Sequence, residues 1–157
     1  MPGAAVADIS EETPPPFVGL ITGDRVNIRS APSLSAEVIS QLSKGNRVQV
    51  LQKRGDWYGV RLPPAISVYV LKGNLQMEGD GSSALARSRV RIRTGPGMAY
   101  AGVGSLSEGQ RVRVKRFVRD WAEIEAAGKG IGWVNRLYVT YFAKEEGVLG
   151  GDNRSIP

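Results

Sequence analysis

The 157-residue sequence contains neither cysteine nor histidine. The missing imidazole excludes Ser/His and Cys/His catalysis and HExxH zinc sites, and the missing thiol excludes cysteine nucleophiles, disulfides and thiolate-bound metals. No stretch of the chain approaches the roughly 18 apolar residues that span a bilayer. We therefore predict no catalytic residue, no metal site, no cofactor and no membrane span. An enzyme of this composition would have to rely on carboxylates, lysine or tyrosine.

Positive charge is concentrated in two blocks. The chain has 21 Lys and Arg against 15 Asp and Glu, a formal net charge of +6. Residues 25–77 hold eight basic and two acidic residues, and residues 89–142 hold ten basic and four acidic residues, so each block alone carries +6. Such blocks attract polyanions, which include nucleic acid, anionic lipid and the acidic polymers of bacterial cell walls.

The chain is an internal duplication. When Arg25 is aligned with Arg89, the segment Arg25–Val70 matches Arg89–Val134 without a gap, and 14 of the 46 aligned positions are identical. Chance would give about three, at the roughly 7% usage of the commoner residues. A repeat of roughly 60 residues therefore occurs twice. The identical positions, numbered in the first repeat, are Arg25, Val26, Ile28, Arg29, Pro32, Leu42, Ser43, Gly45, Arg47, Val48, Val50, Asp56, Trp57 and Val70.

Apolar residues alternate with a period of two in both repeats, which indicates strands. Val60 and Ile124 are matched apolar positions and define the core face, together with Tyr58 and Leu62 in one repeat and Ala122 and Ala126 in the other. Gly- and Pro-containing turns separate the strands, and short helical turns are expected at 71–75 and 135–138. Five short strands in about 50 residues predict an all-β fold with two small five-stranded barrels.

One pair of carboxylates could support acid/base chemistry. Glu123 and Glu125 are two residues apart, so both side chains point to the same face of a strand. The first repeat has Gly59 and Arg61 at these positions. A solvated strand face therefore explains the pair better than a catalytic site.

A series of short motifs occurs in the same order in both repeats. The motifs are VNIRSAPS at 26–33, LSKG at 42–45, VQV at 48–50, GDWY at 55–58 and YV at 69–70, then VRIRTGPG at 90–97, LSEG at 106–109, VRV at 112–114, DW at 120–121 and GWV at 132–134. In this series both repeats resemble bacterial SH3 (SH3b) domains. Arg91 departs from the pattern, since the family usually has Asn there. The resemblance implies two tandem SH3-like barrels and covers about 120 residues.

The resemblance implies a non-catalytic targeting module of the cell envelope that binds peptidoglycan or a wall-associated protein. Nucleic-acid binding is an alternative, because Arg-rich strands near aromatic residues suit phosphate backbones. A structural role in an envelope assembly is a third interpretation. The arginines that motivate the nucleic-acid alternative are Arg89, Arg91, Arg93, Arg111 and Arg113.

The family implies a periplasmic or extracellular location, and the start of the chain bears on it. Ala5-Val6-Ala7 before Asp8 has the small-x-small pattern of a signal peptidase site. The charged and apolar regions that should precede such a site are missing. A secretory signal truncated at the start and a chance match both explain the pattern.

Two grooves are predicted from the alternation. Trp57 and Trp121 lie three residues from the matched core positions and therefore face away from the core, beside the loops that follow Arg29 and Arg93. A Trp beside a guanidinium would suit a sugar or peptide that carries a carboxylate. Alternatively, each Trp packs under its loop and the arginines pair with Asp56 and Asp120. The predicted ligand-binding residues are Arg29, Pro32, Trp57 and Tyr69 in one barrel and Arg93, Pro96, Trp121 and Trp133 in the other.

The predicted domain boundaries follow the repeats. They comprise a flexible Pro-rich N-terminal segment (1–19), a first SH3b domain (20–77), a linker (78–84), a second SH3b domain (85–142) and a flexible tail (143–157). The segment that joins the two domains is too short to let them move independently over large distances.

Overall fold

The computed structural model describes residues 13–126 and 128–144. These residues form short strands and two 3₁₀ turns, and no helical segment among them has the length and hydropathy needed to traverse a bilayer. In chain order the elements are β1 (Phe17–Ile21), β2 (Val26–Arg29), β3 (Val38–Leu42), β4 (Arg47–Arg54), β5 (Trp57–Arg61), β6 (Ser67–Leu71), η1 (Lys72–Asn74), β7 (Leu75–Glu78), β8 (Ser83–Ala86), β9 (Val90–Arg93), β10 (Gly102–Leu106), β11 (Arg111–Val118), β12 (Trp121–Glu125), β13 (Ile131–Asn135), η2 (Arg136–Tyr138) and β14 (Val139–Lys144).

The strands form two seven-stranded sheets of the same topology. The first sheet has the order β14-β1-β4-β5-β13-β2-β3, and the second has the order β7-β8-β11-β12-β6-β9-β10. Strands that occupy the same place in the two orders come from matching parts of the two repeats, so that β4 starts at Arg47 and β11 at the equivalent Arg111. The predicted all-β fold and the tandem repeat are therefore confirmed.

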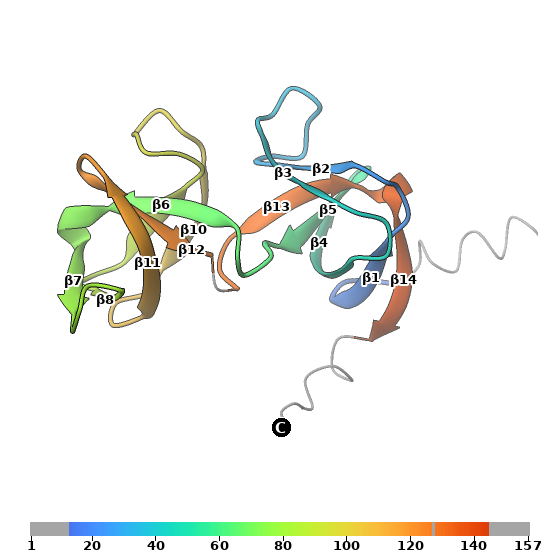
Figure 1. Ribbon diagram of the computed structural model, residues 1–157. Coiled ribbons are helices and arrows are strands. Elements are labelled where there is room, and N and C mark those ends of the chain that lie inside the picture. The colour runs from blue at the N-terminus through green and yellow to red at the C-terminus, as the bar shows by residue number, and fades with distance from the viewer. Residues whose placement is uncertain (1–12, 127, 145–157) are drawn as a thin grey trace, which may run out of the picture. The chain divides into compact units, whose positions relative to one another are not determined.

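The two repeats exchange their C-terminal strands. β6 belongs to the first repeat but lies between β9 and β12 of the second, and β13 lies between β2 and β5 of the first. Figure 1 shows the green β6 among strands of the second repeat and the orange β13 among strands of the first. One compact unit, here called the first unit, comprises the chain up to Arg61 and from Trp133 onward. The second unit is Leu62–Gly132.

Equivalent backbone hydrogen bonds hold the exchanged segments in both units. In the second unit, the Lys72 N–H donates to the carbonyl of Asp120 over 2.8 Å. In the first unit, the Arg136 N–H donates to the carbonyl of Asp56, also over 2.8 Å. Each of these bonds joins a residue of one repeat to a residue of the other. Neither compact unit is therefore complete with one repeat alone.

The compact units differ from the predicted division into barrels over 20–77 and 85–142. Those ranges delimit the repeats, but β6 and β7 lie in the second unit, and β14 with most of β13 lies in the first. The prediction assumed that each repeat closes on itself. Because the repeats share one pattern of apolar positions, β6 and β13 satisfy the alternation in either sheet.

Strand boundaries also differ at the ends of the predicted domains. β1 begins at Phe17 and β8 at Ser83, so residues 17–19 and 83–84 belong to strands rather than to the N-terminal segment and the linker. β14 continues to Lys144, beyond the predicted start of the tail at 143. Each unit thus has seven strands where five were predicted. The predictions for residues 1–12 and 145–157 lie outside the described residues.

The predicted core face is confirmed. Val60 and Ile124 are fully buried, and the neighbouring apolar positions on the same faces are buried with them. The exchanged strands add Val70 to the core of the second unit and Val134 to that of the first, both without exposed surface. The predicted helical turns are present as η1 and η2. Hydrophobic burial in each unit therefore depends on residues from both repeats.

Candidate functional site

Each unit carries a shallow groove of about 200 Å³ beside the loop that connects β2 to β3 in the first unit or β9 to β10 in the second. The alignment of the two repeats maps every lining residue of one groove onto a lining residue of the other. Residues that line the first groove are Arg25, Val26, Asn27, Arg29, Leu34, Trp57, Asn135 and Tyr138. Residues that line the second groove are Leu71, Asn74, Arg89, Val90, Arg91, Arg93, Met98 and Trp121.

The strand exchange makes both grooves composite. Asn135 and Tyr138 of the second repeat line the first groove, and Leu71 and Asn74 of the first repeat line the second groove. Sequence reasoning did not select these four residues, because it assigned them to the opposite barrels. Their positions follow from the exchange of β6 and β13.

Arg29 and Arg93 hold one wall of each groove in place. Arg29 Nη1 donates hydrogen bonds to the carbonyls of Leu34 (3.0 Å) and Ala36 (2.9 Å). In the other unit, Arg93 Nη1 donates to the equivalent carbonyls, of Met98 (3.2 Å) and Tyr100 (2.9 Å). The alternative pairing of Arg29 with Asp56 is not found among the described residues.

Asp56 instead contacts Arg136, with 3.5 Å between Oδ1 and Nε. The pairing predicted for Arg93 with Asp120 is likewise not found among the described residues. The arginines therefore act on the loop backbone, where carbonyl oxygens offer acceptors that a sequence pattern does not reveal.

Leu34 and Met98 are the exposed apolar residues of the two grooves, with 75% and 67% of their surface accessible. Sequence reasoning missed both residues. A signal was available, since they are apolar, lie within polar loops and occupy equivalent positions in the two repeats. Exposed apolar side chains repeated at one place on two units indicate a contact surface.

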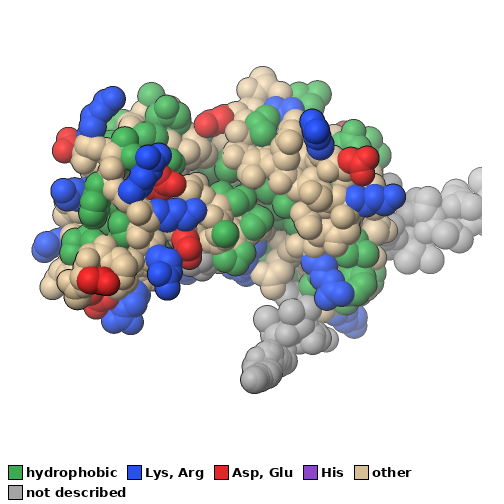
Figure 2. Space-filling view, viewed as in Figure 1, with side chains coloured by type: hydrophobic (Ala, Val, Ile, Leu, Met, Phe, Trp, Pro, Cys, Tyr) green, Lys and Arg blue, Asp and Glu red, His purple; other side chains and the backbone are tan. Residues whose placement is uncertain are grey.

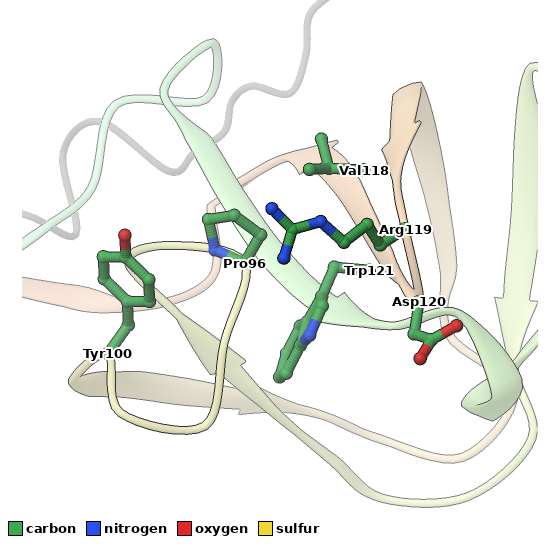
Figure 3. Close-up of a pocket in the computed structure, with 6 residues that line it drawn as sticks. All are labelled: Pro96, Tyr100, Val118, Arg119, Asp120 and Trp121. Atoms are coloured by element: carbon green, nitrogen blue, oxygen red, sulfur yellow. The ribbon is translucent and has the colours of Figure 1, made fainter.

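The two tryptophans line their grooves but differ in burial. Trp57 is half-buried, whereas only 8% of Trp121 is exposed. Trp121 also lines a second depression of about 420 Å³, which Pro96, Tyr100, Val118, Arg119 and Asp120 complete (Figure 3). In this depression the Arg119 side chain extends toward Pro96, while the Asp120 carboxylate points away. The predicted proximity of Trp121 and Pro96 is therefore present, and Pro32 lies half-buried in its loop.

Tyr69 and Trp133 lie in the units opposite to those predicted. Tyr69 pairs with Arg93 in the second unit, and Trp133 pairs with Arg29 in the first. Trp133 is buried, with the guanidinium of Arg54 5.6 Å from its ring centroid. Burial and the nearby Glu123 carboxylate raise the pKa of Tyr69. Neither aromatic residue is among those that line the two grooves.

The carboxylates on β12 form ion pairs. Glu123 Oε1 accepts a hydrogen bond from Arg116 Nε and Oε2 accepts one from Ser67 Oγ, both over 2.6 Å. These two contacts, Arg116 first, lower the pKa of Glu123. Oε1 of Glu125 lies 3.9 Å from Nε of Arg113. A carboxylate held in its ionised form is a poor general acid, which argues against a catalytic role for the pair. The Glu123 side chain is only 12% exposed, so it does not lie on a solvated face. Among the described residues, no group of acidic side chains is arranged to hold a metal ion.

These features define a class of protein, an all-β chain of two SH3-like units, each with a groove beside a loop fixed by an arginine. The chain belongs to the bacterial SH3 domain family, whose model matches residues 24–76 and again residues 88–140. The predicted resemblance to this family is thereby confirmed for both repeats.

The chain is also similar to a protein of Bacillus subtilis (strain 168) named "Putative N-acetylmuramoyl-L-alanine amidase YrvJ". The two are 28% identical over 130 residues, which cover 77% of this chain and 25% of that protein. The chain therefore spans about a quarter of the length of this curated relative.

Proposed function

We propose that the protein is a non-catalytic binding module of the bacterial cell envelope, periplasmic or extracellular, that recognises peptidoglycan or a wall-associated protein through its two grooves. The observation that carries the proposal is the repetition of one groove, residue for residue, in both units. Two weak sites on one chain bind a repetitive polymer with an avidity that neither has alone, provided both can engage it together.

Similarity to a protein named as an N-acetylmuramoyl-L-alanine amidase supports a cell-wall setting. Because the similarity covers a quarter of that protein, and because the chain offers neither His nor Cys, we propose binding rather than hydrolysis for these residues. Each groove combines an apolar side chain, an indole and a guanidinium. Such a surface suits sugars and short peptides, which present both apolar faces and polar groups.

The nucleic-acid alternative is weakened by ion pairs on the arginine-rich strands. Arg111 contacts Glu78 at 2.8 Å and Arg116 contacts Glu123 at 2.6 Å. On the face shown in Figure 2, basic side chains are interspersed with acidic ones and do not form a continuous basic band. A phosphate backbone would have to compete with these carboxylates for the arginines.

Replacing Leu34 and Met98 together with Ser should lower retention on purified sacculi by about ten-fold. Both side chains are largely exposed, so their truncation removes contact surface and leaves the core intact. Retention is measured by co-sedimentation of the full chain with sacculi, and thermal unfolding is followed on the same samples.

Leu137→Ser is the matched control, because Leu137 is 78% exposed and lines neither groove. Retention of the control should equal that of the wild type. Wild-type retention by a folded Leu34→Ser/Met98→Ser variant would contradict the assignment of the grooves. Binding to DNA but not to sacculi, with an affinity that falls steeply as salt is raised, would favour the nucleic-acid alternative.

A further inference from the structure

The two grooves differ in charge. Two arginines line the first groove, three line the second, and no acidic residue lines either. The additional arginine is Arg91, which replaces Asn27 and also departs from the family pattern. Two other lining positions differ in the type of side chain. Asn135 of the first groove corresponds to Leu71 of the second, and Tyr138 corresponds to Asn74.

Asn27 is already engaged within its own unit. Its Oδ1 accepts a hydrogen bond of 2.9 Å from Nε2 of Gln41 on the neighbouring strand. In the second unit the residue opposite Arg91 is Ser105, which is too short to act in the same way. The Arg91 side chain is exposed and has no hydrogen-bond or ion-pair partner among the described residues, and the same holds for the Arg89 side chain. Two guanidinium groups of the second groove are therefore available to a ligand.

A second difference between the repeats makes room for Arg91. Its guanidinium lies over Gly102, and a Cβ on residue 102 would collide with Nε and approach the other guanidinium atoms. The first repeat has Val38 at the equivalent position. An arginine in place of Asn27 would therefore meet the Val38 side chain. Arg91 and Gly102 of the second repeat therefore replace Asn27 and Val38 of the first repeat together.

We infer that the second groove is an anion site that binds the free terminal carboxylate of a short wall peptide; this inference rests on the proposed function. Arg91 and Arg89 supply guanidinium donors, and Arg93 adds charge while it holds the loop. A guanidinium matches the two oxygens of a carboxylate in a bidentate pair.

The other lining residues favour a peptide over a bare anion or a phosphate polymer. Met98, Trp121 and Leu71 offer apolar surface for a small side chain, and the Asn74 amide can bond a peptide group. The volume of about 200 Å³ lies below the range of most small-molecule pockets, so a terminal residue or two fits better than a long segment.

The test is an NMR titration of the ¹⁵N-labelled full chain with acetyl-D-alanyl-D-alanine and, separately, with its C-terminal amide. The free acid should shift residues of the second groove and bind at least ten-fold more tightly than the amide, because the amide cannot accept charge-assisted hydrogen bonds. Arg91→Asn should abolish this preference. The matched variant Arg113→Asn removes an exposed guanidinium of the second unit that lines neither groove, and it should leave the preference unchanged.

The double substitution Asn27→Arg/Val38→Gly introduces the Arg91–Gly102 pair into the first repeat. It should create a preference for the free acid over the amide in the first groove. Equal binding of acid and amide, or a preference that survives Arg91→Asn, overturns the inference. Displacement of the peptide by inorganic polyphosphate at lower concentration than by the free acid also overturns it. Retention on sacculi separates the two claims. Retention without a carboxylate preference refutes this inference alone, and lack of retention refutes the recognition of peptidoglycan in the proposed function.

Discussion

Val70→Asp is expected to unfold the second unit, although Val70 belongs to the first repeat. Val70 lies on β6 with no exposed surface and pairs with Ala122 of β12. Burying an unpaired carboxylate costs several kcal/mol, an amount comparable to the whole stability of a small unit. In ¹⁵N–¹H correlation spectra, the dispersed peaks of residues 62–126 and 128–132 should collapse while those of residues 17–61 remain.

Val134→Asp provides the reciprocal control. Val134 is equally buried and is the residue of the second repeat equivalent to Val70, but its strand completes the first unit. This variant should therefore disrupt residues 17–61 and spare the second unit. Loss of the peaks of residues 17–61 in Val70→Asp, with the peaks of residues 85–126 intact, would show that each repeat closes on itself.

Trp121→Ala should lower the free energy of unfolding by about 3–5 kcal/mol, as expected when a buried tryptophan is truncated. Trp121 is 8% exposed and lies opposite Leu71 of the exchanged strand β6. Trp57→Ala should cost less, because Trp57 is only half-buried. Urea unfolding followed by circular dichroism measures both variants.

The comparison of the two tryptophans decides how binding data are interpreted. If Trp121→Ala costs several kcal/mol, loss of binding in that variant reports loss of the fold and not of a ligand contact. For this reason Leu34 and Met98, which are largely exposed, are better probes of the grooves. A Trp121→Ala variant as stable as the wild type would instead make Trp121 a surface residue.

The sequence alone predicts the local structure of this protein well, because local structure follows from alternation. The period of two correctly places Val60 and Ile124 in the core. The segments after the last strands of the repeats correctly predict the short turns η1 and η2. The proximity of Trp57 to Arg29 follows from the same pattern. The predictions of the core positions and of the two turns need only neighbouring residues in the chain, whereas the proximity of Trp57 to Arg29 also depends on the barrel fold.

The strand exchange could not be predicted, because duplication makes the alternatives equivalent in pattern. β6 and β13 are both buried at their second and fourth positions, so the apolar pattern of either strand satisfies either sheet. The loop-fixing role of Arg29 was missed for a different reason: its acceptors are backbone carbonyls, which every residue possesses. Grouping Tyr69 with Trp57 followed from assigning β6 to the wrong sheet.

Engineered cysteines test the exchange most directly, because the chain has no native cysteine that could form a competing disulfide. Ser67 of the first repeat lies directly opposite Glu125 of the second. If each repeat closed on itself, Ser67 would instead lie opposite Arg61, the residue equivalent to Glu125. Directly opposite residues of antiparallel strands have Cα atoms about 4.5–5.5 Å apart, which a disulfide can bridge.

The decisive measurement is mass spectrometry of the oxidised, monomeric double variants after proteolysis. A disulfide should form in Ser67→Cys/Glu125→Cys and not in Ser67→Cys/Arg61→Cys, since the strand exchange places Arg61 and Ser67 in different units. Ready formation of the disulfide between positions 61 and 67, with none between 67 and 125, would contradict the exchange and the composite grooves that depend on it.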